Sequence, residues 1–206
     1  MGTPAATAEI VLLRHGMTEW SESGRHTGRT DVPLTPEGER QAALVVPALA
    51  RHRFGLALSS PLTRARRTAE LAGIPDIVED PDLQEWDYGG YEGMTTAQIR
   101  AVRPGWLLWR DGVIASPQGK GETADDVATR ADRVIARAEP VLARGENVAL
   151  VSHGHFLRVL AARWLGLGPA AGGLFALDTA SVSALGFEHG ERVIRHWNET
   201  ACSERQ

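Results

Sequence analysis

One short apolar run that ends abruptly in charged side chains constrains the fold of this chain more than any other stretch. Residues 10–13 are Ile, Val, Leu and Leu, and Arg14, His15 and Gly16 follow directly. A bounded apolar run of this length is typical of a buried strand, and glycine lets the backbone turn tightly or approach a ligand closely. Ligands of open α/β sheets bind beyond the carboxyl ends of the strands. We therefore expect Arg14 and His15 to lie in a binding site.

Strand patterns alternate with helix patterns along the rest of the chain. Further strands are expected at 54–59, 77–78, 147–152, 180–188 and 192–197, and helices at 36–51, 62–72, 95–102, 122–143 and 156–165. The polar, glycine-containing pattern from Thr18 to Pro36 predicts a loop. Such alternation favours an α/β fold, here a three-layer α/β/α arrangement around a mainly parallel central sheet. The polar, irregular stretch at about 80–121 predicts a small inserted cap over the edge of the sheet. We expect residues 1–206 to form one domain with this cap.

The bulk properties of the chain exclude several classes of protein. Its 206 residues carry a net charge of −4, which gives no general electrostatic reason to bind nucleic acid or an anionic membrane. No stretch approaches the roughly 18 apolar residues of a membrane span. The single cysteine, Cys202, excludes an internal disulfide, and residues 1–8 lack the features of a secretory signal. We expect a cytoplasmic protein, and a homodimer is compatible with the sequence without being specified by it.

Two other expected strands also end in charged or histidine side chains. The strand at 54–59 leads into a helix with Arg64 in its first turn, and the strand at 147–152 is followed by His153. Parallel strands bring these residues to the same edge of the sheet as Arg14 and His15. Guanidinium groups bind phosphate oxygens in pairs, and helix N-termini add N–H donors. The pattern predicts a pocket for a phosphoryl group, with His15 as the nucleophile and Arg14 beside it.

Four motifs in this order resemble those of the histidine phosphatase superfamily, the phosphoglycerate mutase-like proteins. They are RHG at 14–16, SPLTRA at 60–65, LQEWDYGGYEG at 83–93 and SHG at 152–154. The resemblance runs from about residue 9 to residue 197. It implies a phosphoglycerate mutase-like fold and catalysis without a metal or another cofactor. The substrate it implies is a small phosphorylated molecule.

The resemblance also implies roles for individual residues. His15 would attack phosphorus in line to give a phosphohistidine, while Arg14, Arg64 and His153 bind the phosphoryl oxygens. Glu85 would protonate the leaving alcohol oxygen and then activate water. Glu92 is expected to make a structural hydrogen bond to a loop. Further substrate contacts are expected, from the matching family positions or from proximity in sequence, at Ser21, His26, Thr27, Gly28, Gly154 and His155.

The reaction itself has two main alternatives, hydrolysis and mutase chemistry. The segment 94–106 is shorter and less basic than the insertion that closes over the substrate in cofactor-dependent mutases, so we favour hydrolysis of sugar phosphates or bisphosphates. The motifs are most similar to bacterial acid phosphatases and sedoheptulose-bisphosphatase-like enzymes of the superfamily. A phosphoglycerate mutase remains the alternative, and a non-catalytic phosphate-binding module is a second one. Candidates for contact with a second phosphate are Arg25, Arg29, Arg100 and Arg110.

Overall fold

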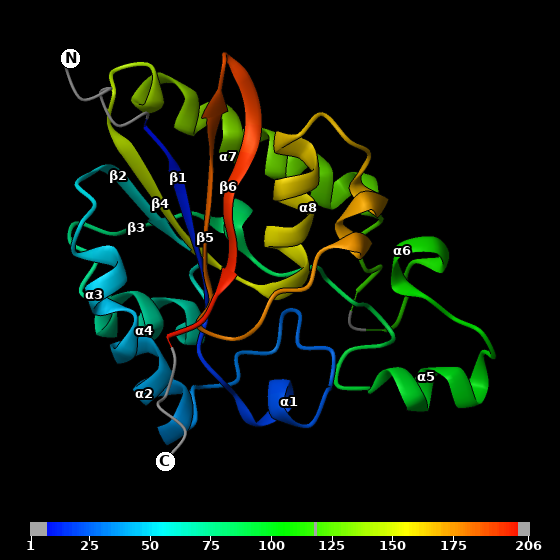
Figure 1. Ribbon diagram of the computed structural model, residues 1–206. Coiled ribbons are helices and arrows are strands. Elements are labelled where there is room, and N and C mark those ends of the chain that lie inside the picture. The colour runs from blue at the N-terminus through cyan, green and yellow to red at the C-terminus, as the bar shows by residue number, and fades with distance from the viewer. Residues whose placement is uncertain (1–7, 118, 202–206) are drawn as a thin grey trace, which may run out of the picture.

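The computed structural model describes residues 8–117 and 119–201, so Cys202 and residues 1–7 lie outside the described part. A six-stranded sheet with the order β3-β2-β4-β1-β5-β6 forms its centre (Figure 1). The elements are β1 Ile10–Arg14, α1 Glu19–Glu22, α2 Pro36–Leu44, α3 Val46–Leu49, β2 Phe54–Ser59, α4 Thr63–Leu71, β3 Val78–Glu79, the 3₁₀ turn η1 Pro81–Leu83, α5 Thr96–Val102, α6 Leu108–Asp111, α7 Ala124–Leu142, β4 Asn147–Ser152, α8 Gly154–Trp164, η2 Pro169–Leu174, β5 Val182–Glu188 and β6 Glu191–Glu199.

Alternate residues of β1 face opposite sides of the sheet, which gives the molecule its three layers. Ile10 and Leu12 pack into a cluster with α7 and α8, whereas Val11 and Leu13 pack into a second cluster with α3 and α4. This alternation follows from the two-residue period of a strand. Figure 1 shows the two groups of helices on opposite faces of the sheet. The predicted three-layer α/β/α fold is confirmed.

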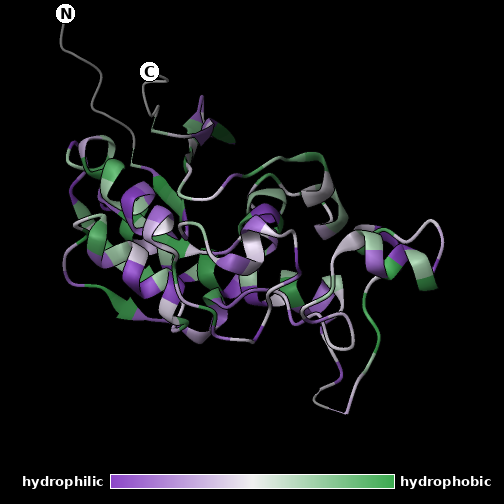
Figure 2. Cartoon of the chain, turned by 90° about the horizontal axis from the view of Figure 1, so that it is seen from below, coloured by the Kyte–Doolittle hydropathy of each residue, from purple (hydrophilic) through white to green (hydrophobic). Residues whose placement is uncertain are grey.

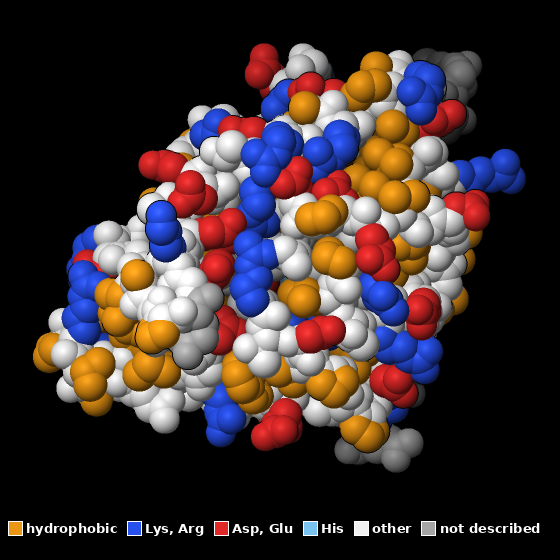
Figure 3. All heavy atoms as spheres, turned by 180° about the vertical axis from the view of Figure 1, so that it is seen from behind, with side chains coloured by type: hydrophobic (Ala, Val, Ile, Leu, Met, Phe, Trp, Pro, Cys, Tyr) orange, Lys and Arg blue, Asp and Glu red, His pale blue; other side chains and the backbone are white. Residues whose placement is uncertain are grey.

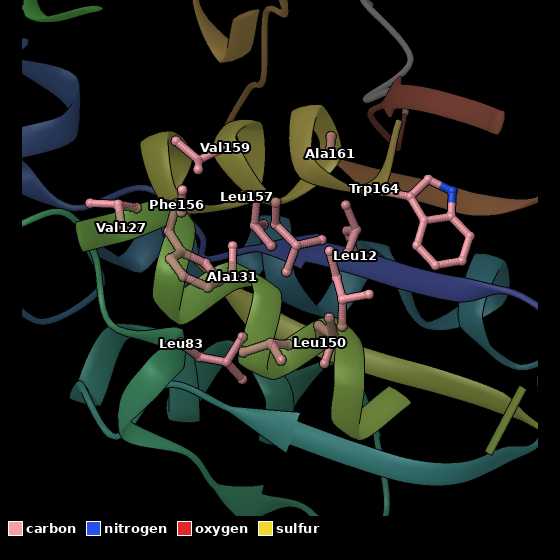
Figure 4. Close-up of a cluster of buried hydrophobic side chains, with 14 of the residues drawn as sticks. Leu12, Leu83, Val127, Ala131, Leu150, Phe156, Leu157, Val159, Ala161 and Trp164 are labelled. Atoms are coloured by element: carbon pink, nitrogen blue, oxygen red, sulfur yellow. The ribbon is translucent and has the colours of Figure 1, made fainter. Parts of the chain in front are cut away.

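The larger cluster fills the space between the sheet and the pair α7 and α8. Figure 4 shows Leu12, Leu150, Phe156 and Leu157 among the side chains gathered between α7, α8 and the sheet. These four side chains are at most 1% exposed. Full burial of each such side chain contributes about 1.5–3 kcal/mol to the free energy of folding. The cluster thereby fixes the N-terminal end of α8 against the ends of β1 and β4.

The carboxyl ends of three parallel strands lie together, as the sequence predicts. Arg14 of β1 pairs in register with Ser152 of β4, and Ser59 of β2 pairs with Val151. β5 pairs with β1 in the antiparallel sense and turns into β6 at residues 189 and 190, which both have positive φ. Since only this last hairpin is antiparallel to its neighbours, the sheet is mainly parallel, and the three charged strand ends meet at one edge.

The connection from β3 to α7 contains η1, α5 and α6, and its described residues add no strand to the sheet. It contains the segment with α5 and α6 that stands to one side of the sheet in both views (Figures 1 and 2). Figure 2 also shows hydrophobic and hydrophilic residues alternating around the helices, as expected for helices that cover a sheet. Within the described ranges, no helix has the length and apolar character needed to cross a lipid bilayer.

Two local expectations are wrong. The helix expected at 36–51 is interrupted between α2 and α3, because Pro47 lacks an N–H group and its ring clashes with the carbonyl four residues earlier. The stretch after Thr18, expected to be a loop, instead begins with α1. Thr18 and Ser21 form a reciprocal capping box at its start, and this short cap stabilises one helical turn.

Candidate active site

A cavity of about 240 Å³ opens at the carboxyl edge of the parallel strands. It is lined by residues from β1, from the loop after α1, from the segment after η1 and from the start of α8. The predicted site residues that line it are Arg14, His15, Ser21, His26, Thr27, Glu85, Gly154 and His155. Arg64, His153 and Gly28 are not part of the lining and lie behind the wall.

His15 lines this cavity, and one of its ring nitrogens is unprotonated. Its Nδ1 lies 2.7 Å from the carbonyl oxygen of Gly16. Because a carbonyl only accepts, Nδ1 carries the hydrogen and Nε2 keeps its lone pair. Burial, together with the guanidinium groups of Arg64 and Arg14, holds the pKa of His15 well below its usual value. The imidazole is therefore neutral and nucleophilic at neutral pH.

Arg14 supplies a buried donor next to this histidine. Its Nη1 donates to the carbonyl of Leu177, while its Nε is buried and finds no hydrogen-bond partner in the described part of the chain. A Cβ atom on Gly154 would lie 3.3 Å from the guanidinium carbon, so glycine at this position leaves room for the arginine. A buried N–H without an acceptor costs free energy, which an anionic ligand can recover by accepting from it.

His153 and Arg64 form a fully buried pair behind His15. The His15 and His153 rings lie 5.2 Å apart between centroids. Arg64 Nε donates to His153 Nδ1 at 3.2 Å, so His153 Nε2 carries the hydrogen and donates to Ser60 Oγ at 2.8 Å. Both ring nitrogens of His153 are thus engaged within the protein. Direct contact of His153 with a phosphoryl group stays a prediction and would replace its bond to Ser60.

The loop after α1 is hydrogen-bonded to the side chains of both Arg64 and Glu92. Arg64 donates to the carbonyls of Thr27, Gly28 and Thr30 at 2.9–3.1 Å. The Glu92 carboxylate accepts from the backbone N–H of Gly28 and of Thr30, which confirms its expected structural bond. A Cβ on Gly28 would lie 2.6 Å from a backbone oxygen. Glycine at position 28 therefore allows the loop to pack closely against the backbone of Trp86.

Glu85 lies at the N-terminus of α8. Its two carboxylate oxygens accept from the backbone N–H groups of Trp86, His155 and Phe156 at 2.9–3.0 Å. A carboxylate is the natural partner of exposed N–H groups at a helix start. Because α8 begins at Gly154, two residues earlier than expected, the N–H groups of His155 and Phe156 belong to its first turn. The helix thus places the carboxylate in the same cavity as His15.

The remaining predicted contacts have local partners of their own. The hydroxyl of Ser21 donates to the carbonyl of Thr18 at 3.0 Å and caps α1. The Thr27 hydroxyl donates to the carbonyl of Arg25 at 3.2 Å. His26 Nδ1 donates to the carbonyl of Met94 at 2.8 Å, which leaves its Nε2 as an acceptor. Ser21, His26 and Thr27 line the cavity in these conformations.

Tyr88 and His155 form an aromatic part of the wall, and the sequence did not single out Tyr88 as a site residue. Tyr88 Oη lies 2.6 Å from His155 Nδ1. Burial raises the pKa of Tyr88 well above its usual value, and burial beside Arg158 lowers that of His155. The neutral phenol therefore donates to a neutral imidazole. His26 packs against Tyr88 with ring centroids 4.9 Å apart.

Arg158 is a second lining residue that the sequence did not single out. It stacks over Trp109 at 4.7 Å and donates through Nε to the carbonyl of Gly172 at 2.9 Å. It stands four positions after Gly154 on α8, and this spacing places both on one helix face. The spacing from Gly154 is the sequence signal that could have identified Arg158 as a lining residue.

The four arginines expected to bind a second phosphate are not brought together. Arg25 lines the cavity. Arg29 instead lies near Asp87 and Glu122. The other two are engaged within their own segment, since Arg100 donates to the carbonyl of Trp106 and Arg110 pairs with Asp111.

Comparisons with known proteins agree with this geometry. The family model described as "Histidine phosphatase superfamily (branch 1)" matches residues 10–200. An acid phosphatase of Mycobacterium tuberculosis is 44% identical over 187 residues, which cover 90% of this chain and 89% of that protein. Sedoheptulose 1,7-bisphosphatase of Saccharomyces cerevisiae is 37% identical over 195 residues, covering 80% of this chain and 70% of the enzyme.

A solved structure shows the same fold. The product of an open reading frame of Mycobacterium tuberculosis superimposes with a TM-score of 0.87 at 42% identity, covering 95% of this chain and 99% of that one. The family model spans all four motifs, from the strand that ends at Arg14 to the last strand. The chain belongs to the histidine phosphatase superfamily, branch 1, and it is a phosphatase.

Proposed function

We propose that this phosphatase hydrolyses phosphate monoesters of small metabolites through a phosphohistidine formed on His15. The observation that carries the proposal is the fixed tautomer of His15. Its Nδ1–H is held by the Gly16 carbonyl, so the neutral Nε2 is available to a ligand in the cavity. A neutral, oriented imidazole is the form that attacks phosphorus.

The other groups of the cavity fit the two halves of the reaction. In the first half, Nε2 of His15 forms a bond to phosphorus while the ester P–O bond breaks, and Glu85 gives a proton to the leaving oxygen. Arg14 Nε, which has no hydrogen-bond partner among the described residues, donates to a phosphoryl oxygen and stabilises its charge. In the second half, Glu85 takes a proton from water as that water attacks the phosphohistidine and releases phosphate.

Hydrolysis is favoured over mutase chemistry by the small contribution of the segment 94–111 to the cavity. Among the described residues of this segment, Thr96 alone lines the cavity. Arg100 and Arg110 are engaged by a carbonyl and by Asp111 within the segment itself. The segment thus provides no cation to hold a phosphoglycerate in place, and water has access to the phosphohistidine.

The substrates we propose are sugar phosphates, including bisphosphates. Arg25 and Arg158 line the cavity, and no described carboxylate lies within ion-pair distance of either. Two unpaired cations beside the phosphoryl site favour a substrate with a second anionic group. A cytoplasmic location belongs to this proposal, because such metabolites are formed and consumed there. Homodimer formation and the absence of nucleic-acid binding remain predictions.

The test compares His15→Ala with His52→Ala, whose histidine lies just before β2 and stacks on Phe54 away from the cavity. Phosphate release is measured from sugar mono- and bisphosphates, phosphoglycerates and p-nitrophenyl phosphate. We expect His15→Ala to lose at least about 1,000-fold in kcat, as for other removed nucleophiles, and His52→Ala to keep wild-type activity.

Two outcomes would contradict the proposal. Equal phosphate release by His15→Ala would exclude His15 as the nucleophile. Rapid isomerisation of phosphoglycerates with little phosphate release by the wild-type protein would identify a mutase instead.

A further inference from the structure

A buried ion pair lies directly beside the segment that carries Glu85, outside the cavity lining. Arg130 of α7 and Glu122, just before α7, form two parallel bonds, Nε to Oε1 at 2.7 Å and Nη2 to Oε2 at 2.9 Å. Their side chains are only 10% and 15% exposed. Arg130 also stacks over Phe156 of α8 at 5.0 Å. This pair is held by packing as well as by charge, so its position is well defined.

The remaining N–H groups of Arg130 hold the backbone on the N-terminal side of Glu85. Nη1 donates to the carbonyl oxygens of Asp82 at 2.6 Å and of Gln84 at 2.8 Å. Nη2 also lies 3.4 Å from the carbonyl oxygen of Glu85 itself. One guanidinium group thus bonds three carbonyls within four residues. Arginine is suited to this, because its five donors form a rigid planar fork.

Glu122 holds the same backbone on the C-terminal side of Glu85. Its Oε2 accepts from the backbone N–H of Asp87 at 2.9 Å. Its carbonyl oxygen accepts from the indole Nε1 of Trp86 at 2.8 Å. The ion pair therefore fixes residues 82–84 through Arg130 and residues 86–87 through Glu122, and Glu85 lies between these two anchored parts.

We propose that Glu122 and Arg130 are positioning residues that hold Glu85 at the distance from which it protonates the leaving oxygen. The proposal rests on the proposed function. Neither residue lines the cavity, so each acts through the backbone of residues 82–87. A proton donor works within about 2.6–3.2 Å of its acceptor, and a displacement of about 1 Å can cost about 100-fold in rate.

A role of this kind has a specific kinetic signature. An alkyl alcohol is a poor leaving group and requires the proton from Glu85 as the P–O bond breaks. p-Nitrophenolate leaves without a proton, so its release depends only on His15 and the phosphoryl contacts. Loss of positioning therefore slows alkyl phosphates selectively, whereas loss of folded protein slows both substrates equally.

The experiment measures kcat/KM for a series of esters from alkyl phosphates to p-nitrophenyl phosphate. kcat/KM reports the steps up to phosphoryl transfer, so hydrolysis of the phosphohistidine does not affect it. The variants are Arg130→Lys, which loses the planar fork, and Glu122→Gln, which keeps an acceptor but loses the charge. We expect both to lose about 10- to 100-fold with alkyl phosphates and at most about 3-fold with p-nitrophenyl phosphate.

Arg163→Lys is the matched control. Arg163 of α8 forms an equally bidentate pair with Asp132 of α7, at 2.9 and 3.0 Å, and its hydrogen bonds among the described residues do not reach residues 82–87. The Arg163→Lys variant should show the same dependence of kcat/KM on the leaving group as the wild type. Glu85→Gln serves as the reference for complete loss of the acid.

The outcomes separate this inference from the function on which it rests. Suppose that only Glu85→Gln loses kcat/KM selectively with alkyl phosphates. Equal losses of kcat/KM for all esters in Arg130→Lys and Glu122→Gln, or no loss in either, would then overturn the positioning role. If Glu85→Gln also shows no selectivity, the assignment of Glu85 as the acid fails together with the inference. Selective losses of kcat/KM with alkyl phosphates in Arg130→Lys, Glu122→Gln and Glu85→Gln, with Arg163→Lys unchanged, support both the positioning role and the assignment of Glu85 as the acid.

Discussion

At the scale of single residues, the tautomer of His15 determines its pH dependence. The Gly16 carbonyl fixes the hydrogen on Nδ1. Burial and the neighbouring guanidinium groups of Arg64 and Arg14 lower the pKa of this histidine well below 6.5. The neutral ring is the nucleophile, so protonation of His15 lowers activity only when the pH falls through that lowered value.

We therefore expect the acid limb of kcat/KM caused by His15 to lie below pH 6.5. The measurement is a pH profile with p-nitrophenyl phosphate, corrected for the second ionisation of the substrate itself. The same pH profile measured with Glu85→Gln shows whether the acid limb of kcat/KM is caused by Glu85. An acid limb at or above pH 6.5 that persists in this variant would contradict a neutral His15.

The sequence predicted those site residues whose chemistry is tied to a strand end or a motif. Arg14 and His15 were predicted because they directly follow the apolar run at 10–13, and Glu85 was predicted from the resemblance of its motif to the family. All three line the cavity. Tyr88 escaped prediction because its position depends on the irregular path of residues 83–93. The involvement of the Ser21 hydroxyl in a cap was predictable, because the Thr18 spacing matches a capping box.

At the scale of elements, boundaries were predicted well where a local cap specifies them. Thr35 accepts from the N–H of Gly38 and starts α2 as expected, and Thr123 starts α7 through a capping box. The path of residues 80–121 was not predictable, because it is set by long-range bonds such as those of Arg130 to the carbonyls of Asp82 and Gln84. Single-sequence patterns contain no information on such contacts.

The attachment of η1 to α7 makes a prediction about stability. Asp82 bonds to Arg133 and Arg137 of α7, and hydrogen bonding to Arg133, followed by that to Arg137, lowers the pKa of this carboxyl from 3.8 to about 2. A carboxyl with a lowered pKa stabilises the folded state above its unfolded pKa. This contribution is lost as pH falls from about 4 toward 2.

Asp82→Asn should therefore lower the free energy of unfolding at pH 7 by about 1 kcal/mol, a modest value because Arg133 is half exposed. The difference in the free energy of unfolding between variant and wild type should become smaller as the pH falls below 4. Urea unfolding at pH 7 and at pH 3 measures it. A difference that stays constant between these pH values, or a variant more stable than the wild type at pH 7, would contradict this account.

At the scale of the whole molecule, most arginines are neutralised locally, whereas those at the cavity are not. Figure 3 shows basic and acidic side chains interspersed over one face, and ion pairs such as Arg163 with Asp132 and Arg192 with Glu139 join elements across the described surface. In the described part of the chain, Arg14, Arg25 and Arg158 have no carboxylate within ion-pair distance, and all three line the cavity. The cavity of a chain with a net charge of −4 thus carries three arginines that no described carboxylate pairs with directly.

This distribution predicts how the enzyme distinguishes its substrates. Arg25→Ala should raise KM for a sugar bisphosphate about 5-fold and leave KM for the matching monophosphate unchanged, because one exposed charge contact contributes about 1 kcal/mol. Arg110→Ala is the matched control, since Arg110 is exposed but paired with Asp111. A phosphorylated carboxylic acid tested alongside shows whether the second group must be a phosphate. Equal KM changes for mono- and bisphosphate, or a larger effect of Arg110→Ala, would assign the second anionic group to another part of the molecule.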